Sequence, residues 1–360
     1  MSKRAEQFHA SPWLGAIYLT GGGSGLIDEL LGTPGASASV LEVQVPYASQ
    51  ALAELIGQVP EQACSALTAR QLAMAAMQRA QNLGEGQLFG RGQLFGRGQL
   101  FGLGCSASLA TNRPKKGIHR AHWAIQTKTE TASFHVQFTS DRAAEEHQLV
   151  EHIWDSLHHV LLGEELDPQI EYLRETGNAD LLGKTPMRIC TTSHSAELIL
   201  PGSFNPLHAG HREMLRVAEK LTGLAGAFEL TTRNADKPAL DFVTLAERRA
   251  QFSDLPLWIT NVPTYAEKAS LFPGAIFCLG TDTMERIGAL RFYQDRQDLL
   301  DEAIELFHTL NIRFLVFGRD QGGFKTLADL HLPSPLSELC QAVPESEYRM
   351  DISSTELRAN

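Results

Sequence analysis

The chain has 360 residues, of which 42 are acidic and 31 basic, so its formal net charge is −11. A protein dedicated to nucleic-acid binding has a basic surface, so this excess of acidic residues argues against that class. It does not exclude a local basic groove. Hydrophobic residues make up 43% and charged residues 20%, which excludes a wholly disordered chain. At about 150 residues per domain, the length predicts two domains.

Membrane-spanning and secretory segments are not expected. The sequence has no run of about 18 apolar residues, and the charges of residues 1–7 are not followed by the apolar core of a secretory signal. The five cysteines are Cys64, Cys105, Cys190, Cys278 and Cys340. They are widely spaced and form no Cys-x-x-Cys, which argues against a disulfide framework or a structural zinc site. We therefore expect a cytoplasmic protein.

The first predicted domain covers residues 1–164. Apolar runs and alternating patterns predict its strands, and apolar residues at helical spacing predict its helices. In chain order we expect a strand at 13–19, a glycine-rich loop at 20–25, a helix at 26–31, a strand at 39–45, a helix at 68–82, a hairpin at 121–127 and 131–138, and a helix at 142–162. The last helix carries His147, His152, His158 and His159. Their spacings do not bring them to one face, so no metal site is expected.

A hexapeptide occurs three times in residues 86–103. The copies begin at Gly86, Gly92 and Gly98; the first two read Gly-Gln-Leu-Phe-Gly-Arg and the third ends in Leu. Because six is an even number, in a strand every Leu of the repeat would lie on one face and every Phe on the other. Three copies are too few for a β-solenoid. We interpret the repeat as an expanded loop or a strand extension, with a binding role as the alternative.

Residues 165–196 are polar and rich in turn formers, which is typical of a linker. The second predicted domain, residues 197–360, alternates strands and helices. Strands are expected at 198–200, 227–230, 257–260, 276–279 and 312–317, with helices at 209–222, 244–253, 264–271 and 297–309. This alternation predicts an α/β fold with a Rossmann-like, doubly wound parallel sheet.

The strongest functional signal follows the first of these strands, where residues 201–211 read Pro-Gly-Ser-Phe-Asn-Pro-Leu-His-Ala-Gly-His. Open α/β sheets bind ligands at the carboxyl ends of their strands, and the start of a helix presents unpaired N–H groups that suit a phosphate. His208 and His211 are three residues apart and share a face of that helix, while Gly210 leaves room for a closely approaching group. Two imidazoles and the helix dipole would stabilise charge that builds on a phosphoryl group.

A second signal lies in residues 351–358, which read Asp-Ile-Ser-Ser-Thr-Glu-Leu-Arg. Ser353 or Ser354 can cap a helix whose first N–H groups bind phosphate. Arg358 lies three residues after Thr355, so it joins the same face, and a planar guanidinium is well shaped to clamp phosphate oxygens. The alternative is a plain capping sequence followed by a solvated arginine.

Weaker candidates stand at the ends of other strands and in one loop. Asp282 follows Gly280 at a strand end, where an acidic residue often holds a ribose hydroxyl. Arg319 follows the last predicted strand and Lys237 lies in a loop at the same edge, so either could reach a phosphate. For each of the three charged residues, an ordinary solvated side chain is the alternative.

Together these motifs resemble the nucleotidyltransferase superfamily. The residues that carry the resemblance are Gly202, Ser203, Phe204, Asn205, Pro206, His208, Gly210, His211, Ile352, Ser353, Ser354, Thr355 and Arg358. The pairing of His-x-Gly-His with Ile-Ser-Ser-Thr and a following Arg is most similar to the nicotinamide or nicotinate mononucleotide adenylyltransferases. The resemblance covers residues 197–360. It implies transfer of AMP from ATP to a nucleotide 5′-phosphate, with release of pyrophosphate and with Mg²⁺.

The resemblance also implies roles for individual residues. The expected catalytic residues are His208, His211 and Arg358, and the motifs also supply the expected nucleotide-binding residues Gly202, Ser203, Phe204, Asn205, Ser353, Ser354 and Thr355. The strand ends and the loop described above add Lys237, Gly280, Asp282 and Arg319 to the expected nucleotide-binding residues. The two histidines would contact the ATP phosphates, and the residues of the second motif would hold the triphosphate. Small nucleotides are therefore the expected partners, nucleic acids and membranes are not, and a homo-oligomer is left open.

Two other functions stay open. A regulatory protein that only binds pyridine nucleotides would be stabilised by its ligand without releasing pyrophosphate. A transferase for another phosphate acceptor is the second, because pantetheine-phosphate and cytidylyl relatives share the first motif. The arginine after the Ser-Ser-Thr run favours the pyridine-nucleotide branch.

The first domain resembles the CinA C-terminal family over residues 10–164. The resemblance is carried by residues 20–22, 32–38, 45–49 and 104–108, which read Thr-Gly-Gly, Gly-Thr-Pro-Gly-Ala-Ser-Ala, Val-Pro-Tyr-Ala-Ser and Gly-Cys-Ser-Ala-Ser. It implies a three-layer α/β fold, and the family includes nicotinamide mononucleotide amidohydrolases.

This sequence departs from that family at the positions that matter for hydrolysis. Ile17, Tyr18 and Leu19 stand where the family has Glu-Ser-Cys or a similar run, and Leu52 stands where it has a lysine. A hydroxyl nucleophile needs a base or a lowered pKa, and Thr20 has no evident activator here. We expect a domain that binds a nucleotide without hydrolysing it, or one with a structural role.

Overall fold

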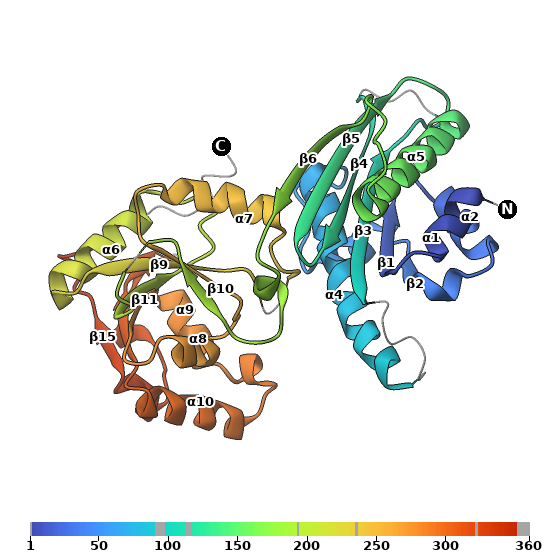
Figure 1. Cartoon of the computed structure of the whole chain (residues 1–360). Helices are drawn as coiled ribbons and strands as arrows, with labels where there is room; N and C mark the ends of the chain where they lie inside the picture. Colours follow the sequence, from blue (N-terminus) through green and yellow to red (C-terminus); the bar gives the residue numbers. More distant parts are fainter. Residues whose placement is uncertain are drawn as a thin grey trace. The chain divides into compact units, whose positions relative to one another are not determined.

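The computed structural model describes residues 2–90, 98–112, 117–192, 194–234, 237–320 and 323–350, with the backbone alone for residues 85–90. The chain divides into two compact units, shown in Figure 1. The first unit comprises residues 1–182 together with 236–245, and the second comprises residues 183–235 and 246–360.

The first unit is built on a six-stranded sheet with the order β2-β1-β3-β4-β5-β6. The strands are β1 (Trp13–Thr20), β2 (Val40–Gln44), β3 (Gln99–Ser108), β4 (His119–Thr127), β5 (Glu130–Phe138) and β6 (Glu171–Thr176). β1 pairs in parallel with β2 and β3, and the pairs from β3 to β6 are antiparallel. The predicted first strand and the predicted hairpin are confirmed.

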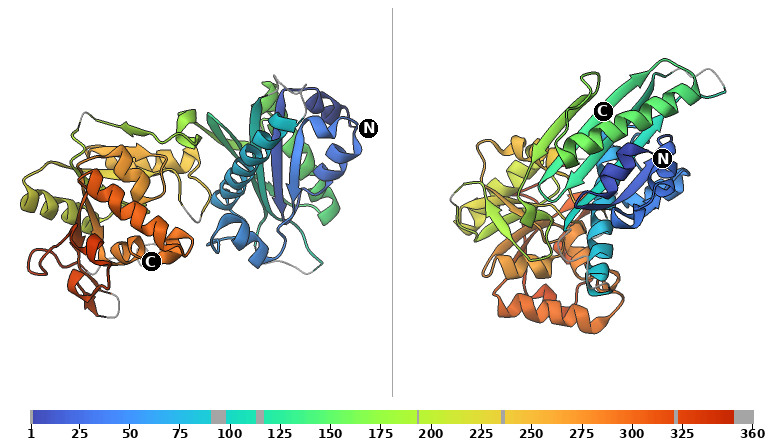
Figure 2. Two further views of the ribbon diagram at one scale, coloured as in Figure 1. Left: turned by 90° about the horizontal axis from the view of Figure 1, so that it is seen from below. Right: turned by 45° about the vertical axis from the view of Figure 1, so that its right-hand side comes forward.

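Helices cover both faces of this sheet, so the first unit has three layers (Figure 2). The helices are α1 (Lys3–His9), α2 (Gly25–Gly32), α3 (Ser49–Ile56), α4 (Ala66–Gly90) and α5 (Arg142–Leu157). The period of two along β1 divides its side chains between the faces. Ile17 and Leu19 pack in the core beneath α1, α2 and α5, whereas Ala16 and Tyr18 pack against α3 and α4.

The hexapeptide repeat adopts more than one structure. Its first copy supplies the end of α4 and its third copy begins β3, while residues 91–97 lie outside the described residues. In the third copy, Phe101 lies in the core on one face and Gly102 faces α4 on the other, as neighbouring residues of a strand do. A side chain at Gly102 would lie 2.2 Å from the carbonyl oxygen of Ala73, so the glycine lets α4 lie directly on β3.

The segment predicted as a linker contributes a strand to each sheet. β6 forms the edge of the first sheet beside β5, and β7 (Arg188–Cys190) pairs antiparallel with β10 (Leu257–Thr260) in the second. The structure divides the chain at residue 182, inside that segment. β6 is almost wholly exposed and therefore polar, and β7 has only three residues, so neither gives the apolar run that reveals a buried strand.

The second unit contains a seven-stranded sheet with the order β15-β12-β11-β8-β9-β10-β7. Its other strands are β8 (Leu198–Pro201), β9 (Gly226–Thr231), β11 (Ile276–Gly280), β12 (Arg313–Phe317) and β15 (Cys340–Ala342). All pairs except β10–β7 are parallel. The chain winds outward from β8 in both directions, which confirms the predicted doubly wound sheet.

The helices of the second unit follow the predicted alternation. They are α6 (Ala209–Thr222), α7 (Phe242–Arg249), α8 (Tyr265–Leu271), α9 (Thr281–Ile287), α10 (Gln297–Thr309) and α11 (Ser334–Ser337), with the start of α7 counted in the first unit. On one face of the sheet, Ile199, Phe277 and Phe314 pack against residues of α8, α9 and α10. Among the described residues, no helix combines the length and apolar character needed to cross a membrane.

Candidate active site

Three neighbouring strands of the second unit, β8, β11 and β12, end at the same edge of the sheet. Because they are parallel, the segments that follow them gather there. Residues 202–211 follow β8, Gly280 and Asp282 stand at the end of β11, and Arg319 comes directly after β12. The structure therefore brings three of the predicted segments to one place.

A tight turn after β8 is anchored by a buried ring. Phe204 has a positive φ of 44°, and its side chain is fully buried. Its ring packs edge-on against Phe228 and Phe252, with centroid distances of 5.4 and 5.1 Å. Gly202 is required beside it, because a Cβ there would lie 2.6 Å from the Phe204 ring. Burial of the phenyl group therefore fixes the backbone that leads to the histidines.

Side chains of the following elements hold the outside of this turn. Arg248, on α7, donates to the carbonyl oxygen of Ser203 at 2.8 Å. Gln251 donates to the carbonyl oxygen of Phe204 at 3.2 Å and accepts from the backbone N–H of Leu207 at 2.8 Å. The side chains of Ser203 and Asn205 remain exposed at the sheet edge, where a ligand can reach them.

The two predicted histidines lie against each other at the start of α6. His208 is the N-cap residue and His211 lies in the first turn, with ring centroids 3.7 Å apart and ring planes 26° apart. The backbone N–H of His208 donates to Nδ1 of His211 at 3.3 Å. Nδ1 is therefore an acceptor, and the neutral ring of His211 carries its proton on Nε2.

Both imidazoles are neutral at neutral pH. Burial lowers the pKa of His211 to about 3, and the neighbouring His208 and the positive charge of Arg319 act in the same direction. Partial burial and the positive charge of Arg319 also lower the pKa of His208. The pair therefore offers hydrogen-bond donors to an anion without contributing a full positive charge of its own.

The glycine between the histidines is closely surrounded. A Cβ on Gly210 would lie 3.0 Å from both Cε1 and Nδ1 of His208. The hydroxyl of Tyr348 donates to the carbonyl oxygen of Gly210 at 3.3 Å, and the Tyr348 ring packs edge-on against Phe317 at 5.0 Å. Tyr348 therefore ties the chain after β15 to the first turn of α6.

Asp282 and Arg319 form an ion pair at the same edge. Nη1 of Arg319 lies 3.2 and 3.1 Å from the two carboxylate oxygens of Asp282, and both side chains are partly exposed. Gly280 permits this arrangement, because a Cβ there would lie 2.6 Å from Oδ1 of Asp282. The guanidinium is held beside the histidines, where it can also meet phosphate oxygens.

Of the remaining predicted site residues, the structure describes Lys237. Lys237 is exposed and lies in the segment 236–245, which belongs to the first unit rather than to the unit that carries the histidines. Ser353, Ser354, Thr355 and Arg358 lie outside the described residues. Conversely, sequence reasoning missed Tyr348 and Arg248, whose contacts are with residues far away along the chain. An aromatic residue in the polar stretch just before residue 351 was the only local signal for Tyr348.

The arrangement of donors suits a phosphate group, and the carboxylate of Asp282 suits a hard cation. The backbone N–H groups at the start of α6, the two imidazoles and the guanidinium of Arg319 are all donors, which is the chemistry that phosphates select. Mg²⁺ keeps several waters and takes one or two carboxylates besides substrate phosphates. The carboxylate of Asp282 is such an oxygen donor, so the described residues fit a Mg²⁺ that arrives with a nucleotide.

In the first unit, the glycine-rich loop of residues 20–25 binds a carboxylate of the chain itself. Glu146, on α5, accepts from the backbone N–H groups of Gly23 and Gly25 and from the hydroxyl of Ser24, at 2.9, 3.2 and 2.9 Å. Partial burial opposes ionisation, but these hydrogen bonds outweigh it and lower the pKa of Glu146. The hydroxyl of Thr20 donates to the carbonyl oxygen of Pro46 at 3.0 Å, which is not a base that could activate it.

Residues 199–360 match the family model described as cytidylyltransferase-like. This part of the chain is thus a cytidylyltransferase-like domain of the nucleotidyltransferase superfamily, in agreement with the sheet and with the motif after β8. No curated protein matches the sequence.

Three solved structures of competence/damage-inducible proteins are similar to the chain. A protein from Agrobacterium tumefaciens is 16% identical, with a TM-score of 0.32 over 43% of this chain and 92% of that chain. One from Enterobacter asburiae is 15% identical, with a TM-score of 0.35 over 44% and 94%. A CinA superfamily protein from Klebsiella pneumoniae is 15% identical, with a TM-score of 0.32 over 45% and 95%.

Proposed function

We propose that the second unit transfers AMP from ATP to the 5′-phosphate of nicotinamide or nicotinate mononucleotide, as a step of NAD biosynthesis in the cytoplasm. The observation that carries the nucleotidyl-transfer part of the proposal is the donor group at the ends of β8, β11 and β12. His208, His211 and Arg319 converge there on the start of a helix. The choice of a pyridine nucleotide rests on the resemblance of the motif in residues 351–358.

The proposed reaction needs positioning and charge stabilisation rather than a protein nucleophile. An oxygen of the acceptor phosphate attacks the α-phosphorus of ATP, a new P–O bond forms, and the bond from the α-phosphorus to the bridging oxygen breaks. Pyrophosphate leaves with the electron pair of that bond. Mg²⁺, when bound with ATP, supplies positive charge to the phosphate oxygens.

The residues of this chain act as donors during that transfer. Nε2–H of His211 and the N–H groups at the start of α6 donate to oxygens whose negative charge grows in the transition state. Because the pKa of His211 is near 3, the ring keeps a single proton and donates without giving it up. Arg319 supplies the fixed positive charge, and Ser353, Ser354, Thr355 and Arg358 are proposed to hold the triphosphate as the resemblance implies.

The test is pyrophosphate release by the full chain with ATP and Mg²⁺, using nicotinamide mononucleotide, nicotinate mononucleotide and pantetheine phosphate as separate acceptors. We expect release with a pyridine mononucleotide. His211→Ala should lower turnover by about 10²–10³-fold, the usual effect of removing one such donor. Arg216→Gln is the matched control, because Arg216 is exposed on the same helix and pairs only with Glu213 among the residues that the structure describes.

Each other result of this assay would indicate a different function or a wrong site. Release with pantetheine phosphate alone would assign a different acceptor to the same site. ATP-dependent thermal stabilisation without release for any acceptor would support a regulatory nucleotide-binding protein instead. Normal turnover in His211→Ala would refute the assignment of the site.

A further inference from the structure

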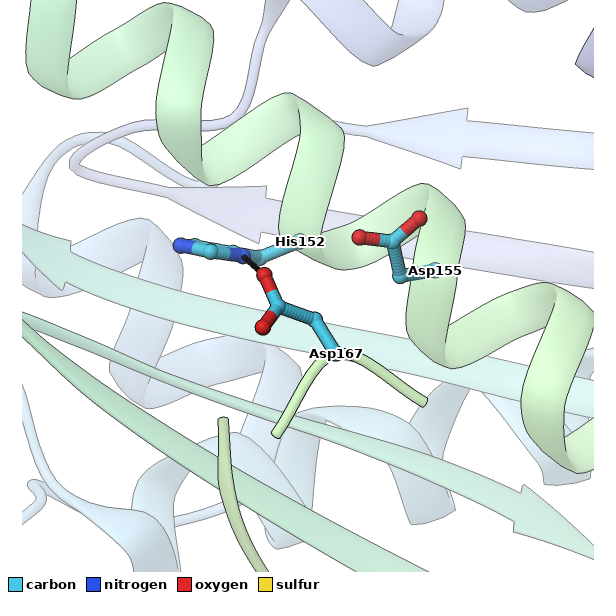
Figure 3. A group of neighbouring side chains, drawn as sticks. All are labelled: His152, Asp155 and Asp167. Atoms are coloured by element: carbon cyan, nitrogen blue, oxygen red, sulfur yellow. Dashed lines mark ion pairs between the residues drawn. The ribbon is translucent and has the colours of Figure 1, made fainter. Parts of the chain in front are cut away.

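A cluster of metal-ligating side chains lies in the first unit and plays no part in the proposed transfer. His152 and Asp155 project from α5 three residues apart, so they share a face of the helix. Asp167 approaches them from the loop that follows the helix, as Figure 3 shows. One ligand atom from each residue lies within 4.8 Å of the other two. The spacing of the histidines does not reveal this cluster, because its other two ligands are aspartates and one of them lies in a loop.

The spacing between His152 and Asp167 fits a bridging ion better than a hydrogen bond. Nδ1 of His152 and Oδ2 of Asp167 are 3.9 Å apart, beyond hydrogen-bonding distance. Two metal–ligand bonds of about 2.1 Å span about 3.4 Å at a tetrahedral angle and about 4.2 Å in line. Nδ1 is buried and has no hydrogen-bond partner among the described residues. An ion between the two atoms would satisfy this nitrogen.

The surroundings hold the ligands in this orientation. Oδ1 of Asp167 accepts from the backbone N–H of Gln169 at 2.9 Å, so Oδ2 is left for His152. The His152 ring is parallel to the ring of Trp123, with an angle of 5° between their planes. Nε1–H of Trp123 donates to Ser156, whose hydroxyl donates to the carbonyl oxygen of His152 at 2.8 Å. The hydrogen bond to Asp167 is of the kind that orients ligands in metal sites, and the bond from Ser156 fixes the backbone of His152.

The charge and the donor types favour a transition metal. Two carboxylates carry two negative charges, and Nη2 of Arg4 lies 3.1 Å from Oδ1 of Asp155, where it offsets part of that charge. The other guanidinium nitrogen, Nη1, lies 3.0 Å from Glu151. An imidazole together with carboxylates suits Zn²⁺, Co²⁺ or Ni²⁺, whereas Mg²⁺ and Ca²⁺ prefer oxygen ligands alone.

We propose that His152, Asp155 and Asp167 bind a divalent first-row transition-metal ion, with Zn²⁺ as the representative. The ion would tie α5 to the loop that leads to β6, and water would complete its coordination. This proposal is independent of the reaction proposed for the second unit.

The experiment is a calorimetric titration of the chelator-treated full chain with Zn²⁺, and separately with Mg²⁺. We expect the wild-type protein to bind about one Zn²⁺ ion more per chain than His152→Gln and Asp167→Asn, or to bind it at least about tenfold more tightly. Comparison with these variants separates this site from any binding by His208 and His211. His147→Gln is the matched control, because His147 is exposed on the same helix.

A variant that is expected to bind Zn²⁺ more tightly than the wild type strengthens the test. Arg4→Gln removes the cation beside Asp155 and should tighten Zn²⁺ binding several-fold. Equal Zn²⁺ binding by the wild type, His152→Gln and Asp167→Asn would overturn the proposal, and so would Mg²⁺ binding at this site as tightly as Zn²⁺. If His152→Gln does not fold, Asp167→Asn and Arg4→Gln still decide, because both side chains are partly exposed.

Discussion

Replacement of Gly210 by alanine separates the proposed catalytic role of the histidine pair from the stability of the helix that carries it. Gly210 is the second residue of α6, and its backbone does not need glycine for a positive φ. Alanine is favoured over glycine within a helix by about 1 kcal/mol, so the free energy of unfolding should stay the same or rise. The active site, however, must change.

The size of that change follows from the geometry around His208. The new Cβ would lie 3.0 Å from Cε1 and Nδ1 of the His208 ring, whereas ordinary contacts begin at 3.4 Å, so the ring must move by the difference of 0.4 Å. The Tyr348 hydroxyl, at 3.6 Å from the same position, can stay. A displacement of about 1 Å in an active site can cost about 10²-fold in rate, so we expect about a tenfold loss of turnover.

The assay is pyrophosphate release together with thermal unfolding of the same preparations. Arg216→Ala, on the exposed side of α6, is the control for a change in the helix alone. Turnover equal to that of the wild type, at unchanged or raised stability, would refute the idea that the position of the His208 ring matters. A large loss of stability would instead refute the expectation that alanine is tolerated at the second residue of α6.

Two further predictions concern stability. Phe204→Ala should lower the free energy of unfolding by about 3–5 kcal/mol in urea, because it empties a fully buried site between Phe228 and Phe252; the exposed Phe292→Ala is its control and should change little. An unfolded histidine titrates near pH 6.5 while the pKa of native His211 is about 3, so the unfolded state binds more protons between these values. The contribution of His211 to the free energy of unfolding should therefore be fully present above pH 6.5 and be lost as the pH falls towards 3. In His211→Gln, the slope of the unfolding free energy against pH should be smaller in this range, by up to about 1.4 kcal/mol per pH unit. An identical pH dependence in that variant would contradict the low pKa.

The parts of the fold that could be predicted are those whose side chains are buried in a regular pattern. Each central strand of the second sheet is an apolar run, and the alternation with helices leaves few arrangements open. α9 was missed because Gly280, the last residue of β11, is also its N-cap, so no loop separates strand from helix. The exposed edge strand β6 was missed because it has no reason to be apolar.

The same distinction applies to the candidate site. His208 and His211 could be predicted because both stand in one short motif on one helix. Asp282 and Arg319 were found because parallel strands end at a common edge. Tyr348 reaches Gly210 across 138 positions of sequence, and no local pattern encodes such a contact. The predicted order of strands does not tell to which unit a long loop belongs, and Lys237 falls in the first one.

The carboxylate of Glu146 in the glycine-rich loop also sets a threshold for any ligand of the first unit. Glu146 is tethered to α5, so it faces Gly23, Ser24 and Gly25 at an effective concentration of about millimolar or higher. A free phosphate has to displace this built-in competitor and leave its charge without those three donors. An anion can therefore occupy the loop only if it binds these donors more strongly than Glu146 does.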